Sequence, residues 1–161
     1  MSSFQTIAQY YNFLRLGKSG YTAMMKDLVK LAIQFANKIE KTGLFNVLSD
    51  IHRNVPAIPV ITFSLKEKHK NFDEYDIMRR LKQYGWIVPA YQMCPNEKEK
   101  SVLRVVVREQ HSEDILSHLM NHLMEVVESL MKEEKKVTGE KTQGAEDESK
   151  IHRHTTYNNV C

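Results

Sequence analysis

Arg104 is the residue of this sequence best suited to recognising an anion. It stands inside a run of β-branched residues, 102–107. On a strand it shares a face with Val102 and Val106. Its planar guanidinium suits a bidentate contact with a carboxylate or a phosphate. The pattern leaves two interpretations open: Arg104 either borders solvent on the open face of a sheet, or it binds such an anion.

The histidines form a second set of candidates. His118 and His122 are four residues apart on a predicted helix, a spacing that could hold a metal ion. No third ligand falls in register with them, so we interpret both as edge residues of that helix. His152 and His154 stand in a charged terminal stretch without a recognisable site. The sequence therefore predicts no metal site.

His69–Lys70 and Cys94 are the remaining reactive candidates. A Schiff-base lysine needs burial or neighbouring cations to lower its pKa, whereas Lys70 lies in a hydrophilic loop. Cys94 lies in another loop, without a local histidine to activate it. The chain also lacks a Gly-rich phosphate loop, a CxxC pair and a Ser/His/Asp set. The residues alone predict no catalytic group.

The composition predicts a soluble domain that positions these residues. The chain has 161 residues, of which 42% are hydrophobic, and a net charge of +3. This is enough to bury a core, and the mixed charges argue against a dedicated nucleic-acid binder. The sequence contains no run of about 18 apolar residues, so it predicts no membrane span. Two distant cysteines and no secretory leader indicate a cytoplasmic protein.

Helical periodicity dominates the first 43 residues. Apolar residues recur at helical spacing from Phe4 until Gly17 interrupts the pattern, and again from Tyr21 to Ile39. Gly43 stands where a C-terminal cap belongs. The second helix has apolar residues on more than one side, so we expect it to connect to a partner element.

The middle of the chain predicts three strands and two helices. The expected strands are 58–65, 86–91 and 101–108. A helix capped by Asp73 and ended by Gly85 separates the first two strands, and Pro95–Glu97 predicts a turn before the third. Ser112 caps a last helix, whose apolar stripe ends at Leu130. We expect an α+β fold: a three-stranded sheet covered by helices.

The pattern divides the chain into three parts. Residues 1–43 are a helical linking segment, and 44–131 form the α/β domain. Residues 132–161 lose the apolar pattern and are expected to be a disordered charged tail.

Two segments carry a resemblance to a known family. Residues 9–17, Gln-Tyr-Tyr-Asn-Phe-Leu-Arg-Leu-Gly, and residues 84–91 with the strand 102–109 after them, resemble the C-terminal part of glutamate decarboxylases of the bacterial and plant type. These are pyridoxal-phosphate-dependent group II decarboxylases. The resemblance runs from about Gln5 to Leu130. It implies the small C-terminal domain of an aspartate-aminotransferase-like (fold type I) enzyme, preceded by its linking helices.

The resemblance also implies a function. The family converts glutamate to 4-aminobutyrate and carbon dioxide, with pyridoxal phosphate as the electron sink. Arg104 matches the family's arginine that holds a substrate carboxylate. The family forms dimers and higher oligomers, so we expect a homo-oligomer, with no nucleic-acid or membrane partner. The tail lacks the basic amphipathic pattern of a calmodulin-binding helix, and His154 only faintly resembles the histidine-bearing terminus of bacterial members.

The departures from the family pattern change the expectation for this chain. The family's Schiff-base lysine follows a histidine well upstream of the segment matched by residues 9–17, and His69–Lys70 falls in the wrong place for it. We therefore expect no catalytic or covalently cofactor-binding residue here, and no decarboxylation by this chain alone. The alternatives are a free-standing interaction or regulatory module that pairs with an intact homologue, and a small-ligand regulatory domain.

Overall fold

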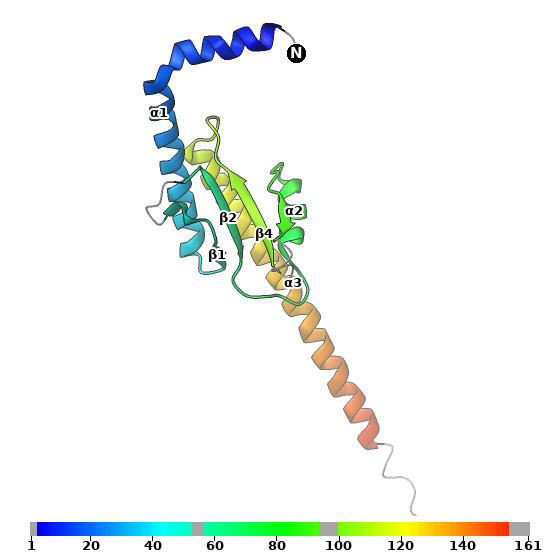
Figure 1. The fold of residues 1–161 in the computed structure, drawn as a ribbon. Coiled ribbons are helices and arrows are strands. Elements are labelled where there is room, and N and C mark those ends of the chain that lie inside the picture. Colours follow the sequence, from blue (N-terminus) through cyan, green and yellow to red (C-terminus); the bar gives the residue numbers. More distant parts are fainter. Residues whose placement is uncertain (1–2, 53–56, 94–99, 155–161) are drawn as a thin grey trace, which may run out of the picture.

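The computed structural model describes residues 3–52, 57–93 and 100–154. The chain folds into two layers, with an antiparallel sheet on one side and three helices on the other (Figure 1). No helix in this described part is both long and apolar enough to cross a bilayer.

The first helix, α1 (Ser3–Lys41), is bent at Gly17. The φ and ψ angles of Gly17 are 56° and −172°, a conformation that side chains with a Cβ rarely adopt. Helical geometry resumes immediately after it, so the predicted interruption is confirmed as a kink. The part before the kink projects away from the body (Figure 1), whereas Leu28, Phe35 and Ile39 of the second part are buried in the core. Gly43, at φ 72°, follows the end of the helix as predicted.

The sheet has four strands rather than the expected three. These are β1 (Phe45–Val47), β2 (Val60–Leu65), β3 (Ala90–Gln92) and β4 (Ser101–Val106), in the order β1-β2-β4-β3. All neighbouring pairs are antiparallel. The extra strand, β1, has three residues, too few for alternation to predict it. Of the strand expected at 86–91, only the end is a strand, because Pro89 cannot donate to a ladder.

The helical layer covers one face of the sheet. Side chains at alternate positions of β2 and β4, among them Ile61, Phe63, Leu103 and Val105, join one buried cluster with residues of all three helices. In Figure 1, α3 (Glu113–His154) lies behind β2 and β4. The opposite face of the sheet carries no helix among the described elements. A short 3₁₀ turn, η1 (Asp50–His52), follows β1.

The second helix, α2 (Glu74–Gln83), begins and ends as the sequence predicts. The Asp73 carboxylate accepts hydrogen bonds from the backbone N–H groups of Tyr75 and Asp76, and the Asp76 side chain accepts from the Asp73 N–H, which completes a capping box. Gly85, at φ 83°, follows its end. Ser112 caps α3 through a 3.3 Å bond from the Ile115 N–H.

The last helix extends past the boundary predicted at residue 131. The backbone of α3 remains helical to His154, where a disordered tail was expected. Glu and Lys, which together make up ten of the residues 132–154, favour helix even without an apolar stripe. Glu133 and Glu134 also contact the domain, as described below. Cys94, Cys161 and the turn predicted at Pro95–Glu97 lie outside the described residues.

Candidate functional site: the open face of the sheet

Arg104 lies on the face of the sheet opposite the helices. In β4, the alternation predicted from the sequence is present: Leu103 and Val105 point into the core, whereas the Arg104 side chain is exposed. Its Cα partner on the neighbouring strand is Thr62, which is half-buried. The site is therefore built on two hydrogen-bonded central strands, which hold the backbone of Arg104 in place.

The Tyr91 ring, on the neighbouring strand β3, contacts the Arg104 guanidinium. It belongs to β3, where it pairs with Val102, so its ring stands diagonally across from Arg104. The Arg104 Cζ lies 5.4 Å from the centre of that ring, within the range of a cation–π contact. In addition, the Arg104 N–H donates to the Pro89 carbonyl oxygen at 3.1 Å, which ties the segment before β3 to β4.

The N–H groups of the Arg104 fork remain available to an anion. The structure pairs Arg104 with no carboxylate of the described residues. A guanidinium presents five donors in one plane, and a cation–π contact with a ring does not use these donors. Val60 and Val106, themselves Cα partners, flank the Thr62–Arg104 pair. The face thus combines one fixed cation with apolar and hydroxyl neighbours, an arrangement that can bind a carboxylate-bearing small molecule.

The other candidates from the sequence lie elsewhere. His122 Nδ1 accepts a 2.8 Å hydrogen bond from the Trp86 indole N–H, and its ring stacks on Tyr84 with centroids 4.5 Å apart. It therefore joins the residues that follow α2 to α3. His118 is exposed on α3. No three His, Cys, Asp or Glu side chains in the described ranges gather as a metal site. His152 and His154 lie in the helical backbone at the end of α3.

His69 and Lys70 form part of a structural contact. The His69 Nδ1 lies 2.8 Å from a Glu134 carboxylate oxygen, and the Lys70 backbone N–H donates to the other oxygen at 2.9 Å. The His69 ring also stacks on Phe72, with centroids 4.2 Å apart. The hydrogen bond from His69 lowers the pKa of the Glu134 carboxyl. These contacts fasten the loop after β2 to α3, while the Lys70 side chain stays exposed.

Two residues that matter for the site carry no sequence signal of their role. Tyr91 is recognised only once the pairing of β3 with β4 is known. Glu74, at 7% exposure, is the buried charged residue of the described core. Its carboxylate accepts from the Leu65 N–H at 2.9 Å and from the Ser101 hydroxyl. It thereby joins the end of β2 to the beginning of β4, the two strands that carry Thr62 and Arg104.

Comparison with known proteins identifies the kind of domain. No family model matches the chain. Among solved structures, a glutamate decarboxylase from Lactobacillus brevis aligns with a TM-score of 0.74 and 29% identity, over 81% of this chain and 29% of that one. The architecture is that of pyridoxal-phosphate enzymes of fold type I.

Sequence relatives narrow this class to one family. A glutamate decarboxylase from Petunia hybrida is 36% identical over 157 residues, which is 95% of this chain and 30% of the relative. A glutamate decarboxylase from Lactococcus lactis is 34% identical over 132 residues, or 81% of this chain and 28% of the relative. The chain is thus a homologue of the glutamate decarboxylases, and it spans less than a third of the length of these relatives.

The described residues do not by themselves form a site for the cofactor of this class. Pyridoxal phosphate needs a lysine amine for its aldehyde and donors for its phosphate. The strand positions on the open face offer Arg104 as a cation, but no lysine and no carboxylate. The described face by itself therefore does not fit this cofactor.

Proposed function

We propose that this chain provides the carboxylate-binding face of a pyridoxal-phosphate-dependent glutamate decarboxylase. Residues 1–43 are the linking element and 44–131 the small domain, with the cofactor held outside the residues described here. The observation that carries the proposal is the exposed Arg104, which lies over the Tyr91 ring and is unpaired with any described carboxylate. Homology to enzymes named glutamate decarboxylase supplies the reaction.

The role of Arg104 in this proposal is binding and orientation. Two parallel N–H groups of the guanidinium bind both oxygens of a substrate carboxylate, while Tyr91 restricts the rotation of the Arg104 side chain. Fixing that carboxylate presents the rest of the substrate in one orientation to the cofactor, the electron sink of the family reaction. Glutamate is the proposed substrate, and we expect the enzyme to be a cytoplasmic homo-oligomer.

A chimeric enzyme tests the proposal. Residues 5–130 replace the matching segment of the Lactobacillus brevis enzyme, and carbon dioxide release from glutamate is measured. We expect an active chimera, and a loss of roughly 100-fold in kcat/KM for Arg104→Ala, because two charge-assisted hydrogen bonds disappear. Arg104→Lys keeps the charge but not the fork and recovers only part of the activity.

A matched control separates this role from a general charge effect. Arg79 is exposed on α2, where it pairs with Asp76 at 2.5 Å on the helical layer. Arg79→Ala removes the same charge and leaves kcat/KM within about twofold. An Arg104→Ala chimera as active as its parent refutes the proposal. The isolated 161-residue chain, supplied with pyridoxal phosphate and glutamate, is expected to release no carbon dioxide.

A second function, an interaction module, is favoured by the N-terminal part of α1. Its large apolar side chains are each more than half exposed: Phe4, Ile7, Tyr10, Tyr11, Phe13 and Leu14. An apolar surface of this kind marks a protein interface. In this version the chain pairs with an intact homologue through that segment. Co-purification with a full-length relative tests this pairing. The double variant Ile7→Glu with Leu14→Glu is expected to abolish it.

A further inference from the structure

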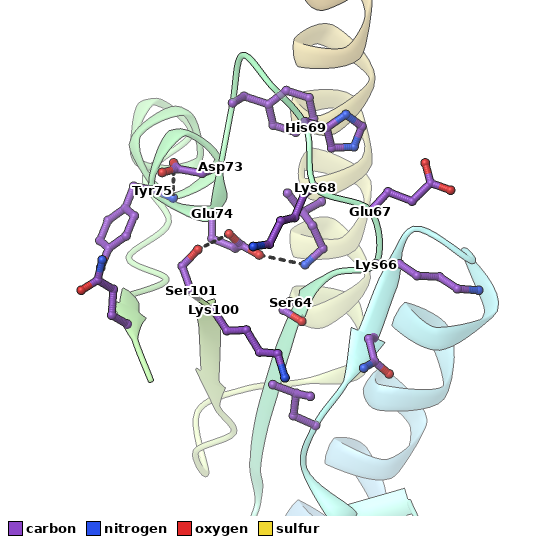
Figure 2. Close-up of a pocket in the computed structure, with 15 residues that line it drawn as sticks. Ser64, Lys66, Glu67, Lys68, His69, Asp73, Glu74, Tyr75, Lys100 and Ser101 are labelled. Atoms are coloured by element: carbon purple, nitrogen blue, oxygen red, sulfur yellow. Dashed lines mark hydrogen bonds between the residues drawn. The ribbon is translucent and has the colours of Figure 1, made fainter. Parts of the chain in front are cut away.

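A cavity of about 670 Å³ opens at the end of the sheet where β2 ends and β4 begins. Its wall is formed by the ends of β1, β2 and β4, the loop 66–73 and the first turn of α2 (Figure 2). This volume lies in the range of sites for small ligands. Arg104 and Tyr91 are not among its lining residues, so the cavity is separate from the site proposed above.

Two of the acidic residues in this wall are occupied by local hydrogen bonds. The Asp73 carboxylate accepts the N–H groups of Tyr75 and Asp76 at 3.0 and 3.1 Å. The Glu74 carboxylate accepts from the Leu65 N–H and the Ser101 hydroxyl. Donors that are already directed at these oxygens stabilise their negative charge. Both carboxylates keep their negative charge, so an anion that enters the cavity is repelled by them and must be held by direct contacts with cations.

The remaining charges of the wall are mostly positive. Lys66, Lys68 and Lys100 line the cavity, against one further carboxylate, Glu67. In the view of Figure 2 the Lys68 side chain runs toward the Glu74 carboxylate and the Lys100 side chain passes near Ser64, whereas Lys66 and Glu67 point away from this space. This part of the cavity thus combines two ammonium groups and a hydroxyl with the Glu74 carboxylate.

We propose that this cavity binds a small molecule carrying a multivalent oxyanion, through Lys68, Lys100 and Ser64. Each ammonium group has three donors and a flexible stem, and the Ser64 hydroxyl can donate to a third oxygen. Lys68 and Lys100 each have an interaction within the chain. The proposal requires only that they share their donors with the ligand. Phosphate and clustered carboxylates have this chemistry in common, and the experiment distinguishes them.

The test is an NMR titration of the full 161-residue chain at constant ionic strength. Pyrophosphate represents the phosphate class, citrate the carboxylate class, and sodium chloride controls for salt. We expect saturable shifts of the backbone N–H signals of Ser64, Lys68 and Lys100 with pyrophosphate, with citrate or with both. Whichever probe saturates at the lower concentration identifies the class of ligand.

Two double variants decide whether the cavity is the site. Lys68→Gln with Lys100→Gln is expected to weaken the binding at least tenfold, because it removes both ammonium groups. Lys26→Gln with Lys30→Gln makes the same change of charge on exposed positions of α1 and is expected to leave binding within twofold. The variants' unchanged spectra away from the substitutions verify their folding.

Three results would overturn the proposal. The first is the absence of saturable shifts with both probes. The second is equal binding by the cavity variant and the unmodified chain. The third is an equal loss in the control variant, which would show that the anions respond only to the overall charge of the chain. None of these results bears on Arg104, so this proposal and the decarboxylase proposal fail independently.

Discussion

Replacing Glu74 with alanine should lower the stability of the domain more than any surface substitution. The carboxylate is 7% exposed and holds the Leu65 N–H and the Ser101 hydroxyl at the ends of two strands. Hydrogen bonds to a charged group contribute about 1.5–3 kcal/mol each when measured by deletion, and the orphaned partners lose their acceptor. Because the two bonds are coupled, we expect a total loss of about 2–4 kcal/mol in the free energy of unfolding.

Urea denaturation of the full chain measures this loss, with the fluorescence of Trp86, the one tryptophan, as the signal. Glu74→Gln keeps an acceptor for the Leu65 N–H and should lose only about 1 kcal/mol. Ser101→Ala alone should also lose about 1 kcal/mol. In the double variant the two losses should not add, since both remove the same hydrogen bond. A loss below about 0.5 kcal/mol for Glu74→Ala, or strict additivity with Ser101→Ala, would refute the assignment.

Two further predictions concern the contacts that α3 makes with the rest of the domain. Arg80 on α2 donates to both Glu133 oxygens, at 2.9 and 2.5 Å, and this hydrogen bonding lowers the pKa of the Glu133 carboxyl below its ordinary 4.5. The pKa of Glu133 is thus lower in the folded chain than in the unfolded chain. The stabilisation that its ion pair with Arg80 gives is therefore complete above about pH 4.5, and it is lost as the pH falls through the folded pKa. The urea midpoint should decline with acid less steeply in Glu133→Gln than in the unmodified chain, and equal slopes would contradict this. The Trp86 indole N–H donates to His122 at 2.8 Å. His122→Ala should therefore accelerate the exchange of this indole proton with solvent at least tenfold, as measured by NMR. An unchanged exchange rate would show that the bond does not form in solution.

The local signals in the sequence were sufficient where one residue determines the backbone. Asp73 predicts the start of α2, and Gly85 follows its end, because capping and positive φ depend on side-chain chemistry within one turn. Gly17 predicts a break that the structure contains as a kink. The alternation in β4 correctly places Arg104 on the face opposite the core.

Features that depend on pairing between distant segments were not predicted. The strand β1 consists of three residues and exists because β2 pairs with it. The contact between Tyr91 and Arg104 depends on the register of β3 against β4. From the sequence, Glu74 is expected to be an acidic residue in the first turn of a helix, where it interacts favourably with the helix dipole. No neighbouring residue in the sequence predicts that its carboxylate joins two strands. Beyond residue 131 the sequence has no apolar stripe, so hydrophobic periodicity gives no signal for the helical backbone that continues to His154.

Glu74 also connects the stability of the domain with the proposed anion site, and the two effects have opposite signs. Glu74 lines the cavity, so Glu74→Gln removes one negative charge from the wall that an oxyanion would face. Two unit charges about 8 Å apart at an effective dielectric constant of ~40 repel by about 1 kcal/mol, which corresponds to roughly fivefold in affinity.

Glu74→Gln should therefore bind pyrophosphate or citrate more tightly in the NMR titration, although it unfolds at a lower urea concentration. A purely structural role predicts the reverse, because a loosened wall would hold any ligand less well. Ser101→Ala serves as the control, since it disturbs the same hydrogen bond without changing the charge and should not tighten binding. If Glu74→Gln binds more weakly and to the same extent as Ser101→Ala, the geometry of the wall outweighs its charge, and the electrostatic argument for the site is wrong.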